Sequence, residues 1–257
     1  MKGTIRSPSK ALLADLIELC GYSPRSGADL DMRVSPMNWY PVSVLQVGSG
    51  DGGTEVAIFE YAADLVVVFR RGDDDAGDLS AVTFEREKFT DLVGMNVSVN
   101  KVALGMWRDL NVHEFVAGWA NENPAGRVFI TGYAMGGTMA LLQAMYTQNH
   151  MDLGDRLVSI TFGAVRAGSR TFVRNFNGAV RNAYRFVNAM DPVSELGGCS
   201  LARLHHPGAV RHLLDDGIHL TYISKWRALL AATFDGSDHA LDAYADAVAS
   251  WNGKIID

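Results

Sequence analysis

Residues 128–137 read VFITGYAMGG, an apolar run that ends in small residues. The first four residues, Val128 to Thr131, are typical of a buried strand, because β-branched and aromatic side chains pack well on a pleated surface. A helical pattern of apolar residues begins at Gly136 and continues to Gln148. We therefore predict a strand, a tight turn and a helix in immediate succession.

The turn has the glycine spacing of a nucleophile elbow, the sharp strand-to-helix turn that exposes one side chain at its tip. Gly132 lies two residues before Ala134 and Gly136 two residues after it, where the tight backbone leaves no room for larger neighbours. The backbone N–H of Met135 would donate to an oxyanion, assisted by the positive end of the helix dipole. Ala134 itself has no atom that can attack an ester. A structural glycine-rich turn shows the same G-x-x-x-G spacing, so the motif alone leaves both interpretations open.

Strand and helix patterns alternate along much of the chain. This alternation predicts an α/β fold with a mostly parallel central sheet flanked by helices, and ligand sites at the carboxyl ends of the strands. Because no repeat or linker divides the elements, we expect a single domain over residues 1–257, with an N-terminal helical extension over residues 1–40. The predicted strands are 42–47, 54–61, 65–69, 128–131, 157–162 and 184–187, and the predicted helices are 12–20, 110–122, 136–148, 169–176, 219–232 and 239–251.

Charge and cysteine usage exclude several classes of function. The chain has 23 basic and 29 acidic residues and no basic cluster, which argues against a nucleic-acid or anionic-membrane surface. Neither Cys20 nor Cys199 has a Cys or His neighbour at metal-binding spacing, so we expect two buried thiols and no metal or cofactor. No segment approaches the roughly 18 consecutive apolar residues of a membrane span, and the first residues lack the apolar core of a signal peptide. We therefore expect a soluble protein of the cytoplasm or another intracellular compartment.

Further stretches, in a fixed order along the chain, carry a resemblance to a known family. They are VVFRRGD at 67–73, ITFGAVRAG at 160–168, RFVNAMDPV at 185–193, and LHHPG at 204–208 with a terminal His239-x-x-x-x-Tyr244. These stretches resemble the class 3 (fungal-type) lipases, whose patterns are V-x-x-F-R-G-T, TFG-x-P-R-x-G and R-x-V-N-x-x-D-P-V. The resemblance covers about residues 40–250. It implies the α/β-hydrolase fold and a Ser-Asp-His mechanism acting on lipid or carboxylic esters.

The same resemblance points to the acid and the histidine of a triad. It assigns the acid to Asp191, which would orient the histidine and stabilise its charged form; an aspartate that caps the turn before Pro192 is the alternative. The histidines that follow are His205, His206, His212, His219 and His239. We choose His239, because it opens the last predicted helix and matches the family's terminal H-x-x-x-x-Y, with His219 as the next candidate. His206 resembles the family's structural histidine, and a surface role is the alternative for His239.

Several positions depart from the family pattern. Asp73 stands where the family has threonine or serine, whose backbone N–H is the second oxyanion donor, and a carboxylate there would oppose the developing negative charge. Arg70 replaces a phenylalanine, Tyr133 replaces a histidine, and residues 103–106 (ALGM) replace an H-x-G-F stretch. A laboratory Ser-to-Ala substitution would change position 134 alone. The several altered positions therefore indicate natural decay.

Residues 79–97 occupy the place where a working lipase would carry its lid. Asp78 resembles an aspartate of the family, but Leu79 stands in place of the tryptophan that follows it. Between a lid and an ordinary helix packed on the core, the apolar residues of this segment favour the helix.

Two functions remain open on the sequence. The first, which we favour because of the clustered departures, is a catalytically silent pseudoenzyme with a binding or structural role in a larger assembly, whose partner would be a lipid or ester ligand or another protein. The second is an active lipid or carboxylic-ester hydrolase written here as a Ser-to-Ala variant. The elbow glycines with Asp191 and His239 support the second function.

Overall fold

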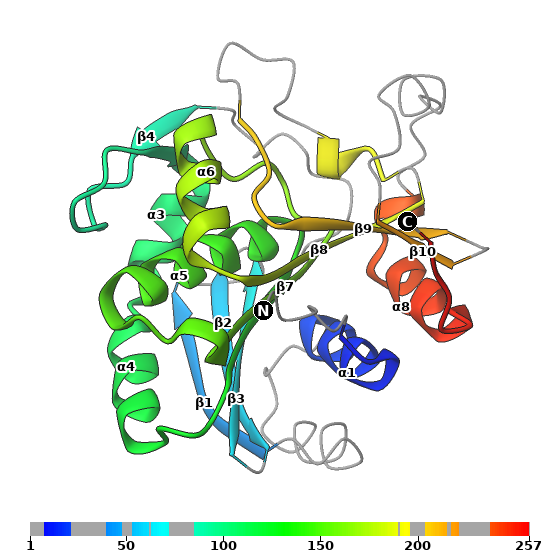
Figure 1. The fold of residues 1–257 in the computed structure, drawn as a ribbon, viewed down its shortest axis with the longest axis horizontal. Coiled ribbons are helices and arrows are strands. Elements are labelled where there is room, and N and C mark those ends of the chain that lie inside the picture. Colours follow the sequence, from blue (N-terminus) through cyan, green and yellow to red (C-terminus); the bar gives the residue numbers. More distant parts are fainter. Residues whose placement is uncertain are drawn as a thin grey trace, which may run out of the picture.

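The computed structural model describes residues 8–21, 40–47, 53–61, 63–71, 85–189, 191–195, 204–214, 217–220 and 237–256. Its strands are β1 Tyr40–Val47, β2 Thr54–Tyr61, β3 Asp64–Arg71, β4 Arg86–Lys88, β5 Ser98–Asn100, β6 Val128–Tyr133, β7 Leu157–Phe162, β8 Asn182–Asn188, β9 Ala209–Leu214, β10 Gly217–His219 and β11 Ile255–Ile256. Within these residues, a nine-stranded sheet has the order β1-β2-β3-β6-β7-β8-β9-β10-β11, and β4 pairs with β5 in a separate small sheet (Figure 1).

The centre of the large sheet is parallel. β3 pairs in parallel with β6, and the parallel pairing continues through β7, β8 and β9. Antiparallel hairpins bring β1 and β2 onto one edge, and β9 pairs antiparallel with β10 near the other. The predicted α/β fold with a mostly parallel sheet is confirmed. Because neighbouring parallel strands end at the same edge, the segments that follow β6, β7 and β8 meet there.

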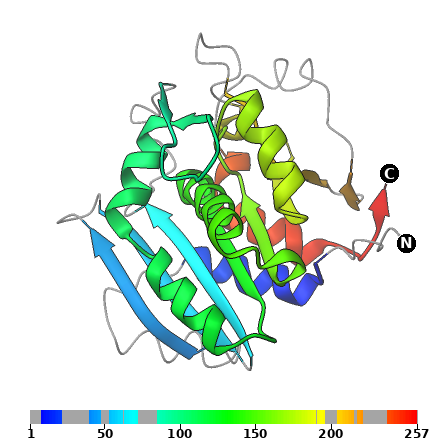
Figure 2. The same cartoon turned by 60° about the vertical axis from the view of Figure 1, so that its left-hand side comes forward.

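Helices cover both faces of this sheet. They are α1 Lys10–Gly21, α3 Lys101–Leu110, α4 His113–Glu122, α5 Ala134–Met151, α6 Arg170–Ala179 and α8 Leu241–Ser250, with short 3₁₀ turns η3 Gly154–Arg156, η4 Val193–Glu195 and η5 Ser237–His239. The buried apolar side chains of α3, α4, α6 and, from Met135 onward, α5 share one core cluster. Those of α1 and α8 share the other cluster with Ala134, the first residue of α5. Both views show α1 and α8 side by side, away from α4 (Figure 2).

β3 shows why its sequence forms a central strand. Leu65, Val67 and Phe69 belong to the core cluster under α3 to α6, whereas Val66 and Val68 belong to the cluster under α1 and α8. Successive side chains of a strand point to opposite faces, so a strand covered on both faces needs an uninterrupted apolar run. The prediction of a buried central strand at this position is confirmed.

α1 is the predicted opening helix, and its basic first residue contacts the end of α8. The Lys10 ammonium donates to the carbonyl oxygens of Ala249 at 2.6 Å and Trp251 at 2.8 Å, where a cation stabilises the last carbonyl groups of a helix. The Cys20 thiol is buried as expected, and burial raises its pKa to about 12. Cys199 lies outside the described residues.

The predicted helix over residues 110–122 was wrong at its start. Two helices occupy this region, because α3 ends at Leu110 and α4 begins at His113. Asn111 separates them in a left-handed conformation with φ 44°, which asparagine tolerates better than most residues. The start of α3 is fixed by Asn100, whose side chain accepts a hydrogen bond from the Ala103 N–H.

The helix favoured for residues 79–97 is also wrong for the part that the structure describes. Residues 85–97 contain the short strand β4 and a turn, and the segment continues into β5. Arg108 fixes this turn through Glu87 and Asp91, at 2.7 Å each. Phe89 and Leu92 are nevertheless buried in the core. The apolar residues of this segment therefore indicate contact with the core and not a helix.

The C-terminal part of the chain adds strands that the sequence patterns did not predict. β9, β10 and β11 extend the sheet beyond β8. His219, the predicted start of a helix, belongs to β10, and residues 221–232 of that predicted helix lie outside the described residues. The last predicted helix is confirmed as η5 followed by α8.

Two glycines allow the backbone of α5 to begin directly against the sheet. A Cβ atom on Gly132 would lie 2.5 Å from the carbonyl group of Gly136. A Cβ atom on Gly136 would lie 2.2 Å from the backbone oxygen of Phe69 in β3. Both neighbours are backbone atoms, which cannot rotate away as a side chain can. The predicted turn therefore needs glycine at both positions for a steric reason.

We expect Gly136→Ala to destabilise the protein by about 3 kcal/mol, the upper range for overpacking, because the clash is with backbone. The matched control is Gly118→Ala in α4, where a Cβ meets no atom within 4 Å and alanine should stabilise the helix by up to about 1 kcal/mol. Urea unfolding of both variants gives the comparison. Equal stability of the two variants would contradict the steric account of the elbow.

Candidate active site

The tip of the elbow carries a strained alanine. β6 ends at Tyr133 in extended conformation, and α5 begins at Ala134 with φ 51°. A positive φ is uncommon for a residue with a Cβ atom and costs on the order of 1–3 kcal/mol. Ala134 is largely buried at 8% exposure. The predicted strand, tight turn and helix are thus present, with position 134 at their junction.

Asp191 and His239 meet as the sequence predicted. Nδ1 of His239 lies 2.9 Å from Oδ2 of Asp191, and both side chains are almost fully buried. Oδ1 of Asp191 accepts hydrogen bonds from the backbone N–H groups of Val193 at 2.8 Å and Ser194 at 3.4 Å. These bonds fix the carboxylate, which in turn fixes the histidine ring and its tautomer.

Tyr244 is a second donor to the same carboxylate oxygen. Its hydroxyl group lies 2.6 Å from Oδ2 of Asp191, and its ring is fully buried. Burial, with the adjacent Asp191 carboxylate, raises the pKa of Tyr244 well above its usual value of about 10. The hydroxyl therefore stays protonated and keeps donating. The terminal H-x-x-x-x-Y pattern contained this tyrosine, but its contact with the acid depends on the fold.

Tyr133 places His239 beside the elbow. The rings of these residues stack with centroids 5.0 Å apart and an interplanar angle of 27°. The Tyr133 hydroxyl donates to the backbone carbonyl of His239. Since Tyr133 directly precedes Ala134, the structure brings the alanine, the histidine and, through its carboxylate, Asp191 into one region. The family pattern has a histidine in place of Tyr133, and it did not predict this stacking on His239.

Gly163, at the end of β7, leaves space for the pair. It adopts φ +56°, and a Cβ there would lie 3.0 Å from both Oδ2 of Asp191 and the Tyr244 hydroxyl. The same Cβ would approach Cε1 of His239 at 3.2 Å. The carboxyl ends of β6, β7 and β8 thus contribute the alanine, this glycine and the acid. Sequence reasoning quoted Gly163 within a motif but gave it no role.

Of the two other predicted members of the site, the structure describes Met135 and does not describe Asp73. Met135 is the second residue of α5, where helical geometry gives its backbone N–H no intrahelical acceptor. That N–H and the positive end of α5 would face an oxyanion at position 134. Asp73, the predicted second donor, lies outside the described residues.

The remaining candidate histidines lie elsewhere. His212 and His219 are opposite each other in the β9–β10 pair, and His205 forms a bridge with Gly168. His206 contacts the carbonyl oxygen of Ser194 through Nε2. Burial, with the nearby Arg185 and Arg166, holds the pKa of His206 well below 6.5. A neutral histidine tied to the turn after Asp191 has the structural role that the sequence suggested.

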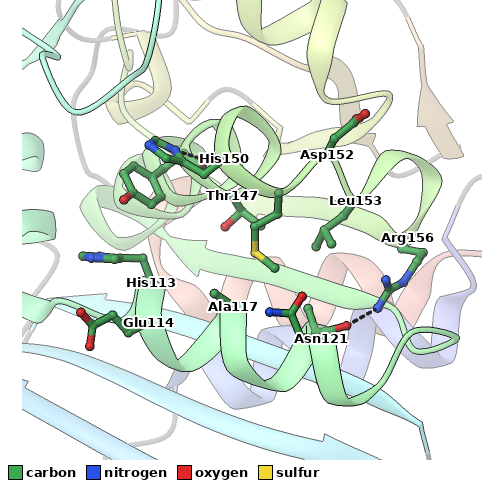
Figure 3. A pocket seen from close by; sticks show the side chains of 12 residues that line it. His113, Glu114, Ala117, Asn121, Thr147, His150, Asp152, Leu153 and Arg156 are labelled. Atoms are coloured by element: carbon green, nitrogen blue, oxygen red, sulfur yellow. Dashed lines mark hydrogen bonds between the residues drawn. The ribbon is translucent and has the colours of Figure 1, made fainter.

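The described residues also form a pocket at a distance from this site. It has a volume of about 610 Å³ and lies between α4 and α5 (Figure 3). Its α5 residues begin at Tyr146, twelve residues after Ala134, which corresponds to about 18 Å along a helix. Within the described residues, no group of three or more His, Cys, Asp or Glu side chains could hold a metal ion.

Comparison with known proteins gives one family and one fold. Residues 66–201 match the family model described as Lipase (class 3). At the level of sequence, no curated protein matches the chain. Among the helices of the described residues, none combines the length and the apolar character that crossing a membrane requires.

Several solved structures share the fold at low sequence identity. The triacylglyceride lipase of Rhizomucor miehei has a TM-score of 0.74 at 19% identity, and the match covers 92% of this chain and 96% of that one. Lipase II of Rhizopus niveus has a TM-score of 0.69 at 19% identity, with 90% of each chain covered. A triacylglycerol lipase in which a serine protease triad forms the catalytic centre has a TM-score of 0.73 at 18% identity, with 92% of this chain and 96% of that chain covered. These similarities establish the α/β-hydrolase fold of fungal lipases.

Replacing Tyr244 with Phe removes one donor to the Asp191 carboxylate and should destabilise the protein by about 2 kcal/mol at neutral pH. The native pKa of Tyr244 is raised, so its contribution is complete below about pH 10 and is lost as the unfolded chain ionises above that pH. The variant should therefore lose less stability than the unmodified chain between neutral and alkaline pH. Urea unfolding across this range measures both effects. A Tyr146→Phe control, at a partly exposed ring, should change stability less at neutral pH, and equal losses would contradict the assigned contact.

Proposed function

The chain belongs to the class 3 lipase family, and we propose that it is a lipase-like pseudoenzyme in which Ala134 stands where the family's nucleophilic serine would stand. One observation carries this proposal: the elbow is complete in its backbone, with alanine at φ 51° at its tip. In serine hydrolases of this fold, the residue at the tip of this turn is the nucleophile. With a methyl group there, no acyl-enzyme can form at this position.

The surrounding contacts support descent from a Ser-Asp-His hydrolase. Asp191 and His239 keep the hydrogen bond that orients a catalytic imidazole. A solved relative of the same fold has a serine protease triad at its catalytic centre. The order of elbow, acid and histidine along this chain is the α/β-hydrolase order. This order and the Asp191–His239 hydrogen bond support the proposal that the chain descends from a hydrolase with a serine nucleophile.

The departures from the family pattern at other positions favour a pseudoenzyme over an enzyme that lacks only its nucleophilic hydroxyl. Asp73 would place a carboxylate beside the oxyanion and would oppose the charge that develops there. A protein of this kind would act by binding, either to a lipid or ester ligand at the elbow or to a protein partner in a larger assembly. A single domain and an intracellular location remain predictions alongside this function.

The alternative function is a lipid or carboxylic-ester hydrolase that is silent only because position 134 lacks its hydroxyl. The intact Asp191–His239 pair favours it. The two proposals differ in what they expect of Asp73. If the chain is an inactivated enzyme, Asp73 is harmless; if the chain has decayed, Asp73 opposes catalysis.

Restoring the hydroxyl with Ala134→Ser separates these proposals. Under the pseudoenzyme proposal, Ala134→Ser alone stays nearly inactive and Ala134→Ser/Asp73→Thr gains about 10²- to 10³-fold in turnover, the usual contribution of an oxyanion donor. Hydrolysis of short and long nitrophenyl esters measures the effect, with Asp73→Thr alone as the control. Equal, robust activity of the single and double variants would establish the enzyme and overturn the pseudoenzyme. An acyl-enzyme formed by the unmodified chain would contradict both.

A further inference from the structure

The pocket between α4 and α5 lies apart from the elbow and has no role in the proposed function. Its volume of about 610 Å³ is in the usual range for sites that enclose a small ligand. We propose that this pocket binds a small organic ammonium ion that has an apolar body and an oxygen able to accept a hydrogen bond. The proposal does not depend on a nucleophile at the elbow, because Ala134, Asp191 and His239 are not among the residues that line the pocket.

A buried hydroxyl group faces this pocket with its proton available. Thr147 lines the pocket although it is only 2% exposed, and Figure 3 shows its side chain pointing from α5 toward α4. The Trp107 side chain donates to Oε1 of Gln143 at 2.8 Å, and Nε2 of Gln143 donates to the Thr147 hydroxyl at 2.9 Å. Within the described residues, the Thr147 hydroxyl itself donates to no acceptor. A buried donor of this kind favours a bound molecule with an acceptor oxygen.

The charged groups that line the pocket favour a cation. Glu114 and Asp152 are exposed, and no basic side chain of the described residues forms an ion pair with either of them. The Arg156 guanidinium instead donates to the backbone carbonyl oxygens of Gly126 and Asn123, at 2.7 Å each. An anion would therefore meet two carboxylates and a guanidinium whose donors are already used, whereas a cation would meet an available carboxylate.

Aromatic rings gather at the Glu114 end of the pocket (Figure 3). The rings of Tyr146 and His150 stack with centroids 3.9 Å apart, and the His113 ring lies 5.0 Å from that of Tyr146. Burial, with the negative charges of Asp91 and Glu114, raises the pKa of the Tyr146 phenol, so the electrostatic potential at this end is negative. Aromatic rings beside a carboxylate attract an organic cation through its charge and its apolar groups.

The length of the pocket suits a molecule with its ammonium and its oxygen at opposite ends. Glu114 and Asn121 both line the pocket from α4, and seven residues of a helix span about 10 Å. Ala117 and Leu153 add apolar contact to the wall (Figure 3), and Thr147 supplies the donor. Tyramine has an ammonium group, an aromatic ring and a phenol oxygen in this order, so it serves as the probe.

Calorimetric titration of the full chain at pH 8, in a buffer without amines, tests the proposal with three probes of similar size. Tyramine should bind. 2-Phenylethylamine lacks the ring oxygen and should bind about 5-fold more weakly, the usual contribution of one hydrogen bond. 4-Hydroxyphenylacetate has the opposite charge and should bind more weakly than either amine. No binding of tyramine at millimolar concentration, or tighter binding of the anion, overturns the proposal.

Two variants assign the binding to named side chains. Thr147→Val keeps the shape and removes the hydroxyl, so tyramine should lose its advantage over 2-phenylethylamine. Glu114→Gln should weaken both amines about 3-fold, as expected for an exposed ion pair. Glu122→Gln is the matched control, because Glu122 is an exposed carboxylate of α4 that does not line the pocket. An unchanged preference in Thr147→Val, or equal losses in the two glutamate variants, overturns the proposal.

Ala117→Phe keeps the test decisive if Thr147→Val fails to fold. Ala117 is partly exposed and lies in the pocket wall, outside the buried chain of hydrogen bonds that ends at Thr147. A phenylalanine there fills the pocket and should abolish binding of both amines, so binding that survives in Ala117→Phe overturns the proposal. The pseudoenzyme proposal fails by a different result, robust esterase activity of Ala134→Ser alone, which none of these titrations measures.

Discussion

The close backbone approach at Gly136 is the constraint on which the site depends. A Cβ there would lie 2.2 Å from the Phe69 carbonyl oxygen, so the first turn of α5 can rest against the end of β3 only with glycine. This contact places the start of the helix at the carboxyl edge of the sheet and forces position 134 to a positive φ. The backbone geometry of a nucleophile elbow therefore follows from packing and does not require a nucleophile.

Asp191 joins the separate segments that complete the site. Its carboxylate accepts hydrogen bonds from the turn that follows it, from His239 in η5 and from Tyr244 in α8. Removing one donor from a buried carboxylate destabilises the protein, because the buried negative charge is left with too few hydrogen bonds. We infer that stability alone can preserve the pair after position 134 has lost its hydroxyl. Retention of Asp191 and His239 is therefore not by itself a sign of esterase activity.

The sequence predicted those features that depend on local pattern, and it missed those that depend on distant contacts. β7 and the elbow followed from apolar runs and glycine spacing, and the pairing of Asp191 with His239 followed from ordered family motifs. The division between α3 and α4 did not, because it depends on the single left-handed residue Asn111. The stacking of Tyr133 on His239 joins residues 106 positions apart, so no window of sequence could show it.

We expect the elbow, His239 and Asp191 to keep the geometry of a serine hydrolase although position 134 has no nucleophile. A crystal structure of the Ala134→Ser variant gives the distance from the new Oγ to Nε2 of His239. We expect about 3 Å, within direct hydrogen-bond reach. A separation beyond about 8 Å, too long even for one bridging water, would contradict this expectation.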